Sequence, residues 1–277
     1  MEVYNNNDGS TGKLSTSKGN QIKFLIGNEW HKADFLGYEG ASEYVCSQLA
    51  KYTNIEDFVE YRIEEISINN KRYNGCVSKN YLNSNEITIT ADRLIKKYKN
   101  ISAQDLIKSE VPLSENIQIF VNTITEITKI EDFGKKLTQL LEWDKFVLNE
   151  DRHFNNIAFI YNEVTDSFRM TPVFDNGAAF LSDIRNDYPL DSFYLTGLIN
   201  SVSSKPFHKD FDTQVEACEK LYGTVLKISK DISISLSTKE ELSRSYGDKI
   251  ADRIVKIFEH QKFINKEMLS EENKKIT

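Results

Sequence analysis

Cysteine is scarce in this sequence, and its few cysteines show no metal-binding pattern. Cys46, Cys76 and Cys218 are far apart and odd in number, none belongs to a Cys-x-x-Cys pair, and the four histidines are scattered. Zinc ligands are usually grouped at short, regular spacings, so this distribution argues against a zinc site. We expect three reduced thiols that are mostly buried.

Long apolar runs are also missing. The longest contain only a few residues, whereas a helix that crosses a bilayer needs about twenty. Residues 1–20 are polar and hold no apolar stretch of the kind that a secretory signal requires. The sequence therefore predicts a cytoplasmic protein without a membrane span, and it leaves export as an effector open.

The sequence has no excess of basic charge. It carries 42 acidic and 35 basic residues, for a net charge of −7, whereas nucleic-acid binders usually gain affinity by neutralising phosphates. Direct nucleic-acid binding is therefore not expected. With 277 residues, of which 39% are apolar and 28% charged, the chain is long and apolar enough to form two medium lobes or one large domain.

The beginning of the chain shows strand patterns followed by a helix pattern. Residues 21–27 alternate apolar and polar side chains, Gly27-Asn28 is a two-residue turn signal, and residues 29–34 return as the partner strand. Residues 40–52 have the i, i+3, i+4 apolar spacing of an amphipathic helix. A hairpin followed by a helix is the predicted structure.

A second hairpin is predicted next, with residues 58–68 and 71–82 on either side of an Asn69-Asn70 turn. After about residue 90 the apolar spacing becomes helical, as in the stripe from Ile117 to Ile127.

The helical part is interrupted once. Two short strands are predicted within residues 156–175, joined near Thr165-Asp166, before helices resume at about 209–229 and 239–268. These patterns predict an α+β fold with a small β-rich lobe followed by a larger helical lobe. The predicted divisions are a flexible lead-in at 1–20, the small lobe at 21–90 and the helical lobe at 91–277.

Two motifs in the second lobe have the spacing of a phosphoryl-transfer site. In protein kinases an Asp that orients the acceptor hydroxyl and a magnesium-binding Asn lie five residues apart on one loop, as do Asp151 and Asn156 in NEDRHFNN. A second magnesium-binding Asp follows a β-hairpin, which is the place of Asp175 before Asn176-Gly177. Alone, either motif is also compatible with a helix cap or a tight turn. Their order and spacing favour a shared site that holds magnesium.

The small lobe contains candidates for the nucleotide side of this site. Lys32 lies in the returning strand of the first hairpin, and Glu43 follows eleven residues later in the helix. Glu39 is a competing partner, but it precedes the periodic part of the helix. The stretch STSKGNQ at 15–21 could cover phosphates with its backbone N–H groups, although it contains only one glycine, Gly19.

The chain resembles the HipA-like serine/threonine kinases, including their shorter, CtkA-type members. The resemblance rests on SKGNQIKF, EWHKAD, YEGASEYVCSQLAKY, LNEDRHFNNIAF and PVFDNGAAFLSD, which lie within residues 17–183. It implies a bilobal protein-kinase-like fold, with ATP and Mg²⁺ as cofactors and a protein as substrate. Longer members have an additional amino-terminal subdomain that engages partners, so a regulatory or antitoxin partner, and a toxin or effector role, are left open.

The resemblance also implies roles for individual residues. Asp151 would be the catalytic Asp, Asn156 and Asp175 the magnesium ligands, and Lys32 the ATP-binding lysine with Glu43 as its partner. Ser17, Lys18, Gly19 and Asn20 would form the phosphate loop. His153 would support the catalytic loop, or would be only a packed structural histidine.

Two other functions are compatible with the same motifs. DRHxxN followed by a metal-binding Asp also occurs in phosphoinositide kinases, although the segment after Asp175 contains three Asp and one Arg before Phe193 and is poorly suited to an anionic lipid. A pseudokinase or a partner-binding module could keep the fold without turnover. The presence of all four key residues, Lys32, Asp151, Asn156 and Asp175, favours an active kinase.

The phosphate loop generates the first prediction. Several HipA-like kinases modify hydroxyls in this loop, and Ser15, Thr16 and Ser17 are the matching cluster. A phosphate there would add nearly two negative charges beside the ATP phosphates and would inhibit the enzyme. After incubation with Mg²⁺ and ATP, mass spectrometry should locate phosphate within residues 15–17. Phosphate found only elsewhere would contradict this mechanism.

Overall fold

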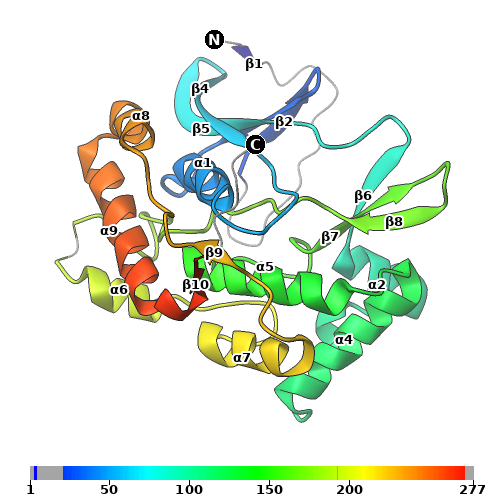
Figure 1. Cartoon of the computed structure of the whole chain (residues 1–277). Helices are drawn as coiled ribbons and strands as arrows, with labels where there is room; N and C mark the ends of the chain where they lie inside the picture. The colour runs from blue at the N-terminus through cyan, green and yellow to red at the C-terminus, as the bar shows by residue number, and fades with distance from the viewer. Residues whose placement is uncertain (1–2, 5–20, 192, 272–277) are drawn as a thin grey trace.

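The computed structural model describes residues 3–4, 21–191 and 193–271. Its first lobe is a five-stranded sheet with the strand order β1-β4-β5-β3-β2 and one helix, α1, packed against it (Figure 1). The elements are β1 (Val3–Tyr4), β2 (Lys23–Ile26), β3 (Glu29–Ala33), α1 (Glu39–Ala50), β4 (Tyr61–Ile68) and β5 (Lys71–Lys79).

Both predicted hairpins of this lobe are confirmed. Gly27 has a φ of +57°, and Asn69 and Asn70 have φ values of +48° and +62°, which are conformations that tight hairpin turns require. The first turn pairs Ile26 with Glu29 and therefore places Lys23 directly opposite Lys32. This register brings two lysines to the same face of the sheet.

The second lobe combines a three-stranded sheet with most of the helices. The sheet has the order β6-β7-β8, from β6 (Glu86–Thr90), β7 (Ala158–Asn162) and β8 (Ser167–Met170). The helices that follow β6 are α2 (Ala91–Lys99), α3 (Ala103–Leu106), α4 (Leu113–Thr128) and α5 (Phe133–Val147). The later elements are α6 (Leu195–Ser201), α7 (Phe211–Tyr222), β9 (Ile228–Ser229), α8 (Leu236–Tyr246), α9 (Asp248–Ile264), a 3-10 turn (Lys266–Met268) and β10 (Leu269–Ser270).

Four details differ from the sequence prediction. The helix predicted at about 209–229 ends at Tyr222, and residues 228–229 form the strand β9. The strand β6 lies within the predicted small-lobe segment but pairs with β7 of the second lobe. The predicted strand through Asp175 ends at Met170, and the chain then runs beside residues 57–59, where Val59 N donates to Val173 O over 2.9 Å. The long predicted helix at 239–268 is two helices, because Gly247 adopts a φ of +84° between them.

The helix α5 lies at the centre of the molecule (Figure 1). One buried cluster joins Val45 and Leu49 of α1 to Phe146 of α5 and Phe258 of α9. A second cluster packs the other part of α5 against α2, α4, β7 and α7. Apolar burial of this kind stabilises the fold, and the first cluster joins the two lobes because it contains residues of α1, α5 and α9. In the described part of the chain, no helix has the length and apolarity needed to cross a membrane.

The helix α8 reaches back to the first lobe. Tyr44 in α1 donates to Glu241 over 2.7 Å, and the Tyr246 hydroxyl donates to Asp34 over 2.8 Å. Asp34 in turn accepts from the backbone N–H of Gly40 over 2.6 Å. The first turn of α1 is therefore enclosed between β5 and α8.

The close approach at Gly40 can be tested by a single methyl group. A Cβ at this position would lie 2.6 Å from the carbonyl carbon of Gly75 and 2.8 Å from Tyr246 Oη. Gly40→Ala should therefore lower the free energy of unfolding by about 1–3 kcal/mol, because the backbone of β5 must shift. Denaturant unfolding would measure this change.

Gly197→Ala in α6 is the matched control. Its Cβ would meet only Tyr194, at 3.0 Å, and this side chain is 78% exposed and can move. Alanine is favoured over glycine within helices by about 0.5–1 kcal/mol, so the control should be neutral or slightly stabilising. Equal effects of the two substitutions would contradict the proposed steric conflict.

Candidate active site

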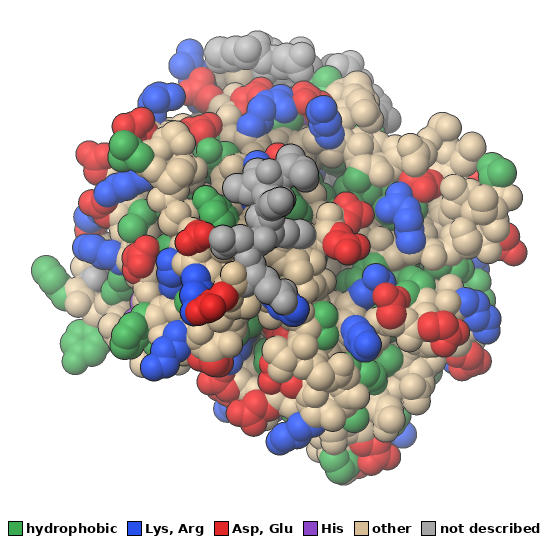
Figure 2. All heavy atoms as spheres, viewed as in Figure 1, with side chains coloured by type: hydrophobic (Ala, Val, Ile, Leu, Met, Phe, Trp, Pro, Cys, Tyr) green, Lys and Arg blue, Asp and Glu red, His purple; other side chains and the backbone are tan. Residues whose placement is uncertain are grey.

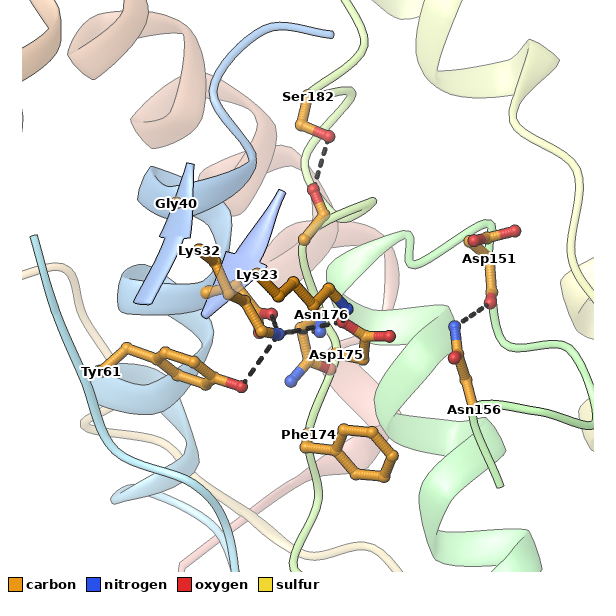
Figure 3. Close-up of polar contacts among 12 residues, drawn as sticks. Lys23, Lys32, Gly40, Tyr61, Asp151, Asn156, Phe174, Asp175, Asn176 and Ser182 are labelled. Carbon is orange, nitrogen blue, oxygen red and sulfur yellow. Dashed lines mark hydrogen bonds and ion pairs between the residues drawn. The ribbon is translucent and has the colours of Figure 1, made fainter. Parts of the chain in front are cut away.

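The predicted catalytic loop begins where α5 ends. Leu148 has a φ of +57°, which stops the helix and turns the chain toward the cleft between the lobes. Asp151 is 6% exposed and Asn156 is 7% exposed. The Asn156 side-chain amide donates to the carbonyl oxygen of Asp151 over 2.8 Å (Figure 3). This bond directs the amide nitrogen inward along the loop and leaves the amide oxygen as the atom able to bind a metal.

Arg152 lies between Asp151 and Asn156 in the same loop, but its side chain points into the protein interior. Its guanidinium is fully buried and pairs with Asp144 of α5 through Nε and Nη2, over 2.8 and 3.0 Å. The same group donates to the carbonyl oxygens of Asn156 and Phe174 over 3.1 and 2.8 Å. Arg152 thus connects the loop of Asp151 and Asn156, and the segment that carries Asp175, to Asp144 of α5.

The backbone on both sides of Asp175 is held by hydrogen bonds. The carbonyl before it, at Phe174, binds Arg152, and the N–H after it, at Asn176, donates to Glu43 Oε2 over 2.8 Å. Asp175 itself has a φ of +58°, a left-handed conformation that costs free energy unless its surroundings impose it. The two anchors impose this conformation and orient the carboxylate toward the first lobe.

Lys32, Glu43 and Asp175 form a buried charge network between the lobes. Lys32 Nζ contacts Glu43 Oε1 and lies 2.9 Å from Asp175 Oδ1, while Tyr61 Oη is 3.3 Å away. Burial would lower the pKa of Lys32, but Asp175 and Glu43 raise it well above its usual range. Lys32 therefore stays charged in the interior.

Lys23 is a member of this site that the sequence prediction missed. Its ammonium group lies 3.2 Å from the same Asp175 oxygen that Lys32 contacts (Figure 3). Burial would raise the pKa of Asp175, but Lys23 and Lys32 hold it well below its usual range. The signal was present in the sequence, because a two-residue turn at Gly27-Asn28 places residue 23 opposite residue 32.

The two other predicted candidates have local roles. Glu39, the competing partner of Lys32, accepts from the backbone N–H groups of residues 35, 36 and 37 over 3.2, 2.6 and 2.9 Å. Its carboxylate is therefore used in the turn before α1. His153 Nε2 lies 3.8 Å from Asp151 Oδ2, so the ring is beside the predicted catalytic carboxylate.

The predicted phosphate loop, including Ser15, Thr16, Ser17, Lys18, Gly19 and Asn20, lies outside the described residues. A cavity is lined by described residues, of which Gln21, which follows this loop in the sequence, is the first. Its lining contains Asp151, Asn156 and Asp175 together, although these residues come from two separate loops. The predicted acceptor-side and metal-side residues thus share one cavity.

The donor set of this cavity fits magnesium. Mg²⁺ is usually bound by one or two protein oxygens together with phosphates and waters, and Asp175 and the Asn156 amide oxygen supply such a pair. In the described part of the chain, no group of three or more His, Cys, Asp or Glu residues is placed to hold a metal ion by itself. This arrangement suits a metal that is shared with a phosphate ligand.

Comparisons with known proteins agree with the architecture. No family model matches the chain, and no curated protein sequence matches it. A solved structure, the Helicobacter pylori proinflammatory kinase CtkA, is similar with a TM-score of 0.60 and 14% sequence identity, covering 91% of this chain and 90% of that chain. This likeness confirms the predicted α+β, bilobal kinase-like fold, while membership of the HipA-like family stays a prediction.

The ion pair of Arg152 generates a stability prediction. Arg152→Met removes one partner of a fully buried pair and leaves Asp144 without its guanidinium, so the free energy of unfolding should fall by about 3–5 kcal/mol. Arg72→Met is the matched control, because Arg72 is 65% exposed and its pair with Glu65, at 3.4 Å, lies on the surface. The control should change stability by less than about 1 kcal/mol. Denaturant unfolding of both variants would show whether the buried pair is as important as its contacts imply.

Proposed function

We propose that this protein is an ATP- and magnesium-dependent kinase that transfers a phosphoryl group to serine or threonine hydroxyls, both on itself and on another protein. The observation that supports this proposal best is that Asp151, Asn156 and Asp175 line one cavity between the two lobes and that Lys32 contacts Asp175. Phosphoryl transfer requires positioning and charge stabilisation more than covalent chemistry. These four residues provide the corresponding groups.

The donor side would bind the phosphates of ATP through Lys23 and Lys32. Two lysines directly opposite each other on a sheet repel, and neighbouring like charges are unfavourable unless an anion lies between them. Here the carboxylate of Asp175 is the anion that contacts both lysines, and Glu43 also pairs with Lys32. A triphosphate carries enough charge to engage both ammonium groups, so Asp175 could then bind magnesium.

Magnesium, when bound, would supply positive charge that neutralises the transferred group. Asp175 and the amide oxygen of Asn156 are the residues that would hold it. Glu43 would keep Lys32 in place, since it binds both the lysine and the Asn176 N–H. Asp151 would accept a hydrogen bond from the acceptor hydroxyl and direct its oxygen toward phosphorus.

The charge around the cleft favours a protein acceptor over a phosphoinositide. The cavity is also lined by Glu39, Glu150 and Asp183, so a phosphorylated lipid headgroup would meet like charges. The face of the molecule in Figure 2 mixes acidic and basic side chains and shows no broad basic surface for an anionic membrane. A hydroxyl on a neutral or basic peptide is a better match.

The central test of this function is Asp151→Asn. The substitution keeps the size of the side chain but removes the carboxylate that orients the acceptor, so labelled phosphate transfer from Mg²⁺-ATP should fall by at least about 100-fold. Circular dichroism and thermal unfolding should show an intact fold. The control Asp231→Asn changes an exposed residue outside the cavity and should keep full activity.

Each alternative function predicts a different result. Equal phosphorylation by the parent protein and Asp151→Asn would show that the assigned role of Asp151 is wrong. Label in phosphoinositide and not in protein would favour a lipid kinase. ATP binding without transfer to any acceptor would indicate a pseudokinase.

A further inference from the structure

A lysine from a distant segment contacts the predicted catalytic carboxylate. Lys205 Nζ lies 2.8 Å from Asp151 Oδ1, although the two residues are 54 positions apart in the sequence. Asp151 has a side-chain exposure of 8%, and that of Lys205 is 38%. The ammonium group of a partly exposed lysine thus contacts a nearly buried carboxylate.

The turn that carries Lys205 is held by buried groups. Gln214 of α7 is fully buried, and its amide donates to the Lys205 carbonyl over 3.0 Å. Its side-chain oxygen accepts from the N–H groups of Phe207 and His208 over 2.9 and 3.2 Å. Ser204 closes the turn by donating to the His208 carbonyl over 2.6 Å.

Aromatic packing attaches the same turn to the helical lobe. The Phe207 ring lies 5.3 Å from the ring of Phe120 and 5.5 Å from that of Phe154, with edge-on geometry in both pairs. Phe154 belongs to the catalytic loop, three residues after Asp151. The backbone at Lys205 is therefore fixed relative to Asp151 by packing and by hydrogen bonds, beyond the ion pair itself.

The loop that carries Asp151 has no lysine or arginine side chain directed toward that carboxylate. Within residues 149–156 the only lysine or arginine is Arg152, and its guanidinium is turned away into the core to pair with Asp144. Lys23 and Lys32 lie on the donor side, at Asp175. Among the lysines and arginines of the described residues, Lys205 is one whose ammonium group contacts the acceptor-side carboxylate.

We propose that Lys205 is a further functional residue of this site, which holds Asp151 in its acceptor-binding orientation and stabilises the negative charge of the phosphoryl group during transfer. This inference rests on the proposed kinase function. In the transfer, a bond forms between the acceptor oxygen and the γ-phosphorus, and the bond from that phosphorus to the β–γ bridging oxygen breaks. The bonding electron pair leaves with ADP, and the hydroxyl proton passes to Asp151 and then to solvent.

The charge of Lys205 has a stronger effect in the transition state than in the ground state. During phosphoryl transfer, negative charge is spread over the three equatorial oxygens of the transferred group. A cation that is already in position stabilises this charge without a rearrangement of the protein. The nucleotide is held mainly by the first lobe in this proposal. Loss of Lys205 should therefore affect kcat and leave the KM for ATP nearly unchanged.

The test compares Lys205→Met, Lys205→Arg and Lys209→Met with the parent protein. Lys205→Met keeps the aliphatic length without the charge and should lower kcat by roughly 10- to 100-fold, with the KM for Mg²⁺-ATP within about twofold. Lys205→Arg should recover a large part of kcat because it keeps the charge. Lys209→Met removes an exposed lysine of the same turn and should behave as the parent.

The outcomes separate this inference from the kinase proposal. If the parent protein transfers no phosphate, the proposed function fails first. If the parent is active and Lys205→Met has the same or a higher kcat, the role of Lys205 is overturned. A lower kcat that Lys205→Arg does not restore, together with a lower melting temperature, would assign Lys205 a structural role and would also overturn the inference.

Discussion

The ion pair between Asp144 and Arg152 is the interaction on which the rest of the site depends. Burying both charges is unfavourable unless almost every donor and acceptor is satisfied, and Arg152 uses its remaining N–H groups on two backbone carbonyls and on Asn176 Oδ1. Because these groups belong to different loops, satisfying the guanidinium also aligns the loops. The positions of Asp151 and Asp175 are thus consequences of one buried cation in the core.

The helix α1 connects this centre to the first lobe. Ser42 and Glu43 of α1, and Tyr38 just before the helix, bind the segment that follows Asp175. Tyr38 Oη and Ser42 Oγ donate to the carbonyls of Phe180 and Ala179 over 2.6 and 2.9 Å, and Glu43 accepts from Asn176 N–H. On its other side, α1 is bounded by α8 through Tyr44 and Glu241. The position of Glu43, and therefore of Lys32, is set by packing from both lobes.

Local patterns predicted much of this molecule, and tertiary packing decided the rest. The turns at Gly27-Asn28 and Asn69-Asn70 were readable because tight hairpins need residues that accept a positive φ, and they fixed the strand register. The Asp151-Asn156 spacing predicted that both residues lie in one loop, and the structure joins them there by a hydrogen bond; their roles in catalysis stay a prediction. Arg152 also lay within that motif, but its inward direction depends on Asp144, and the approach of Lys205 depends on how α7 packs. Such contacts between distant segments leave no periodic signal.

The cleft contains two groups of ion pairs, one at each end. At one end, Lys23 and Lys32 meet Asp175; at the other, Lys205 meets Asp151. At Asp175 the two lysines could instead face a phosphate if a magnesium ion took their place at the carboxylate, so joint binding of Mg²⁺ and a polyanion would leave no buried charge unpaired. In the proposed function, this composition would let the cleft bind a highly charged nucleotide. The same exchange would free Asp175 for magnesium on the donor side, while the fixed turn of Lys205 would keep a positive charge at Asp151.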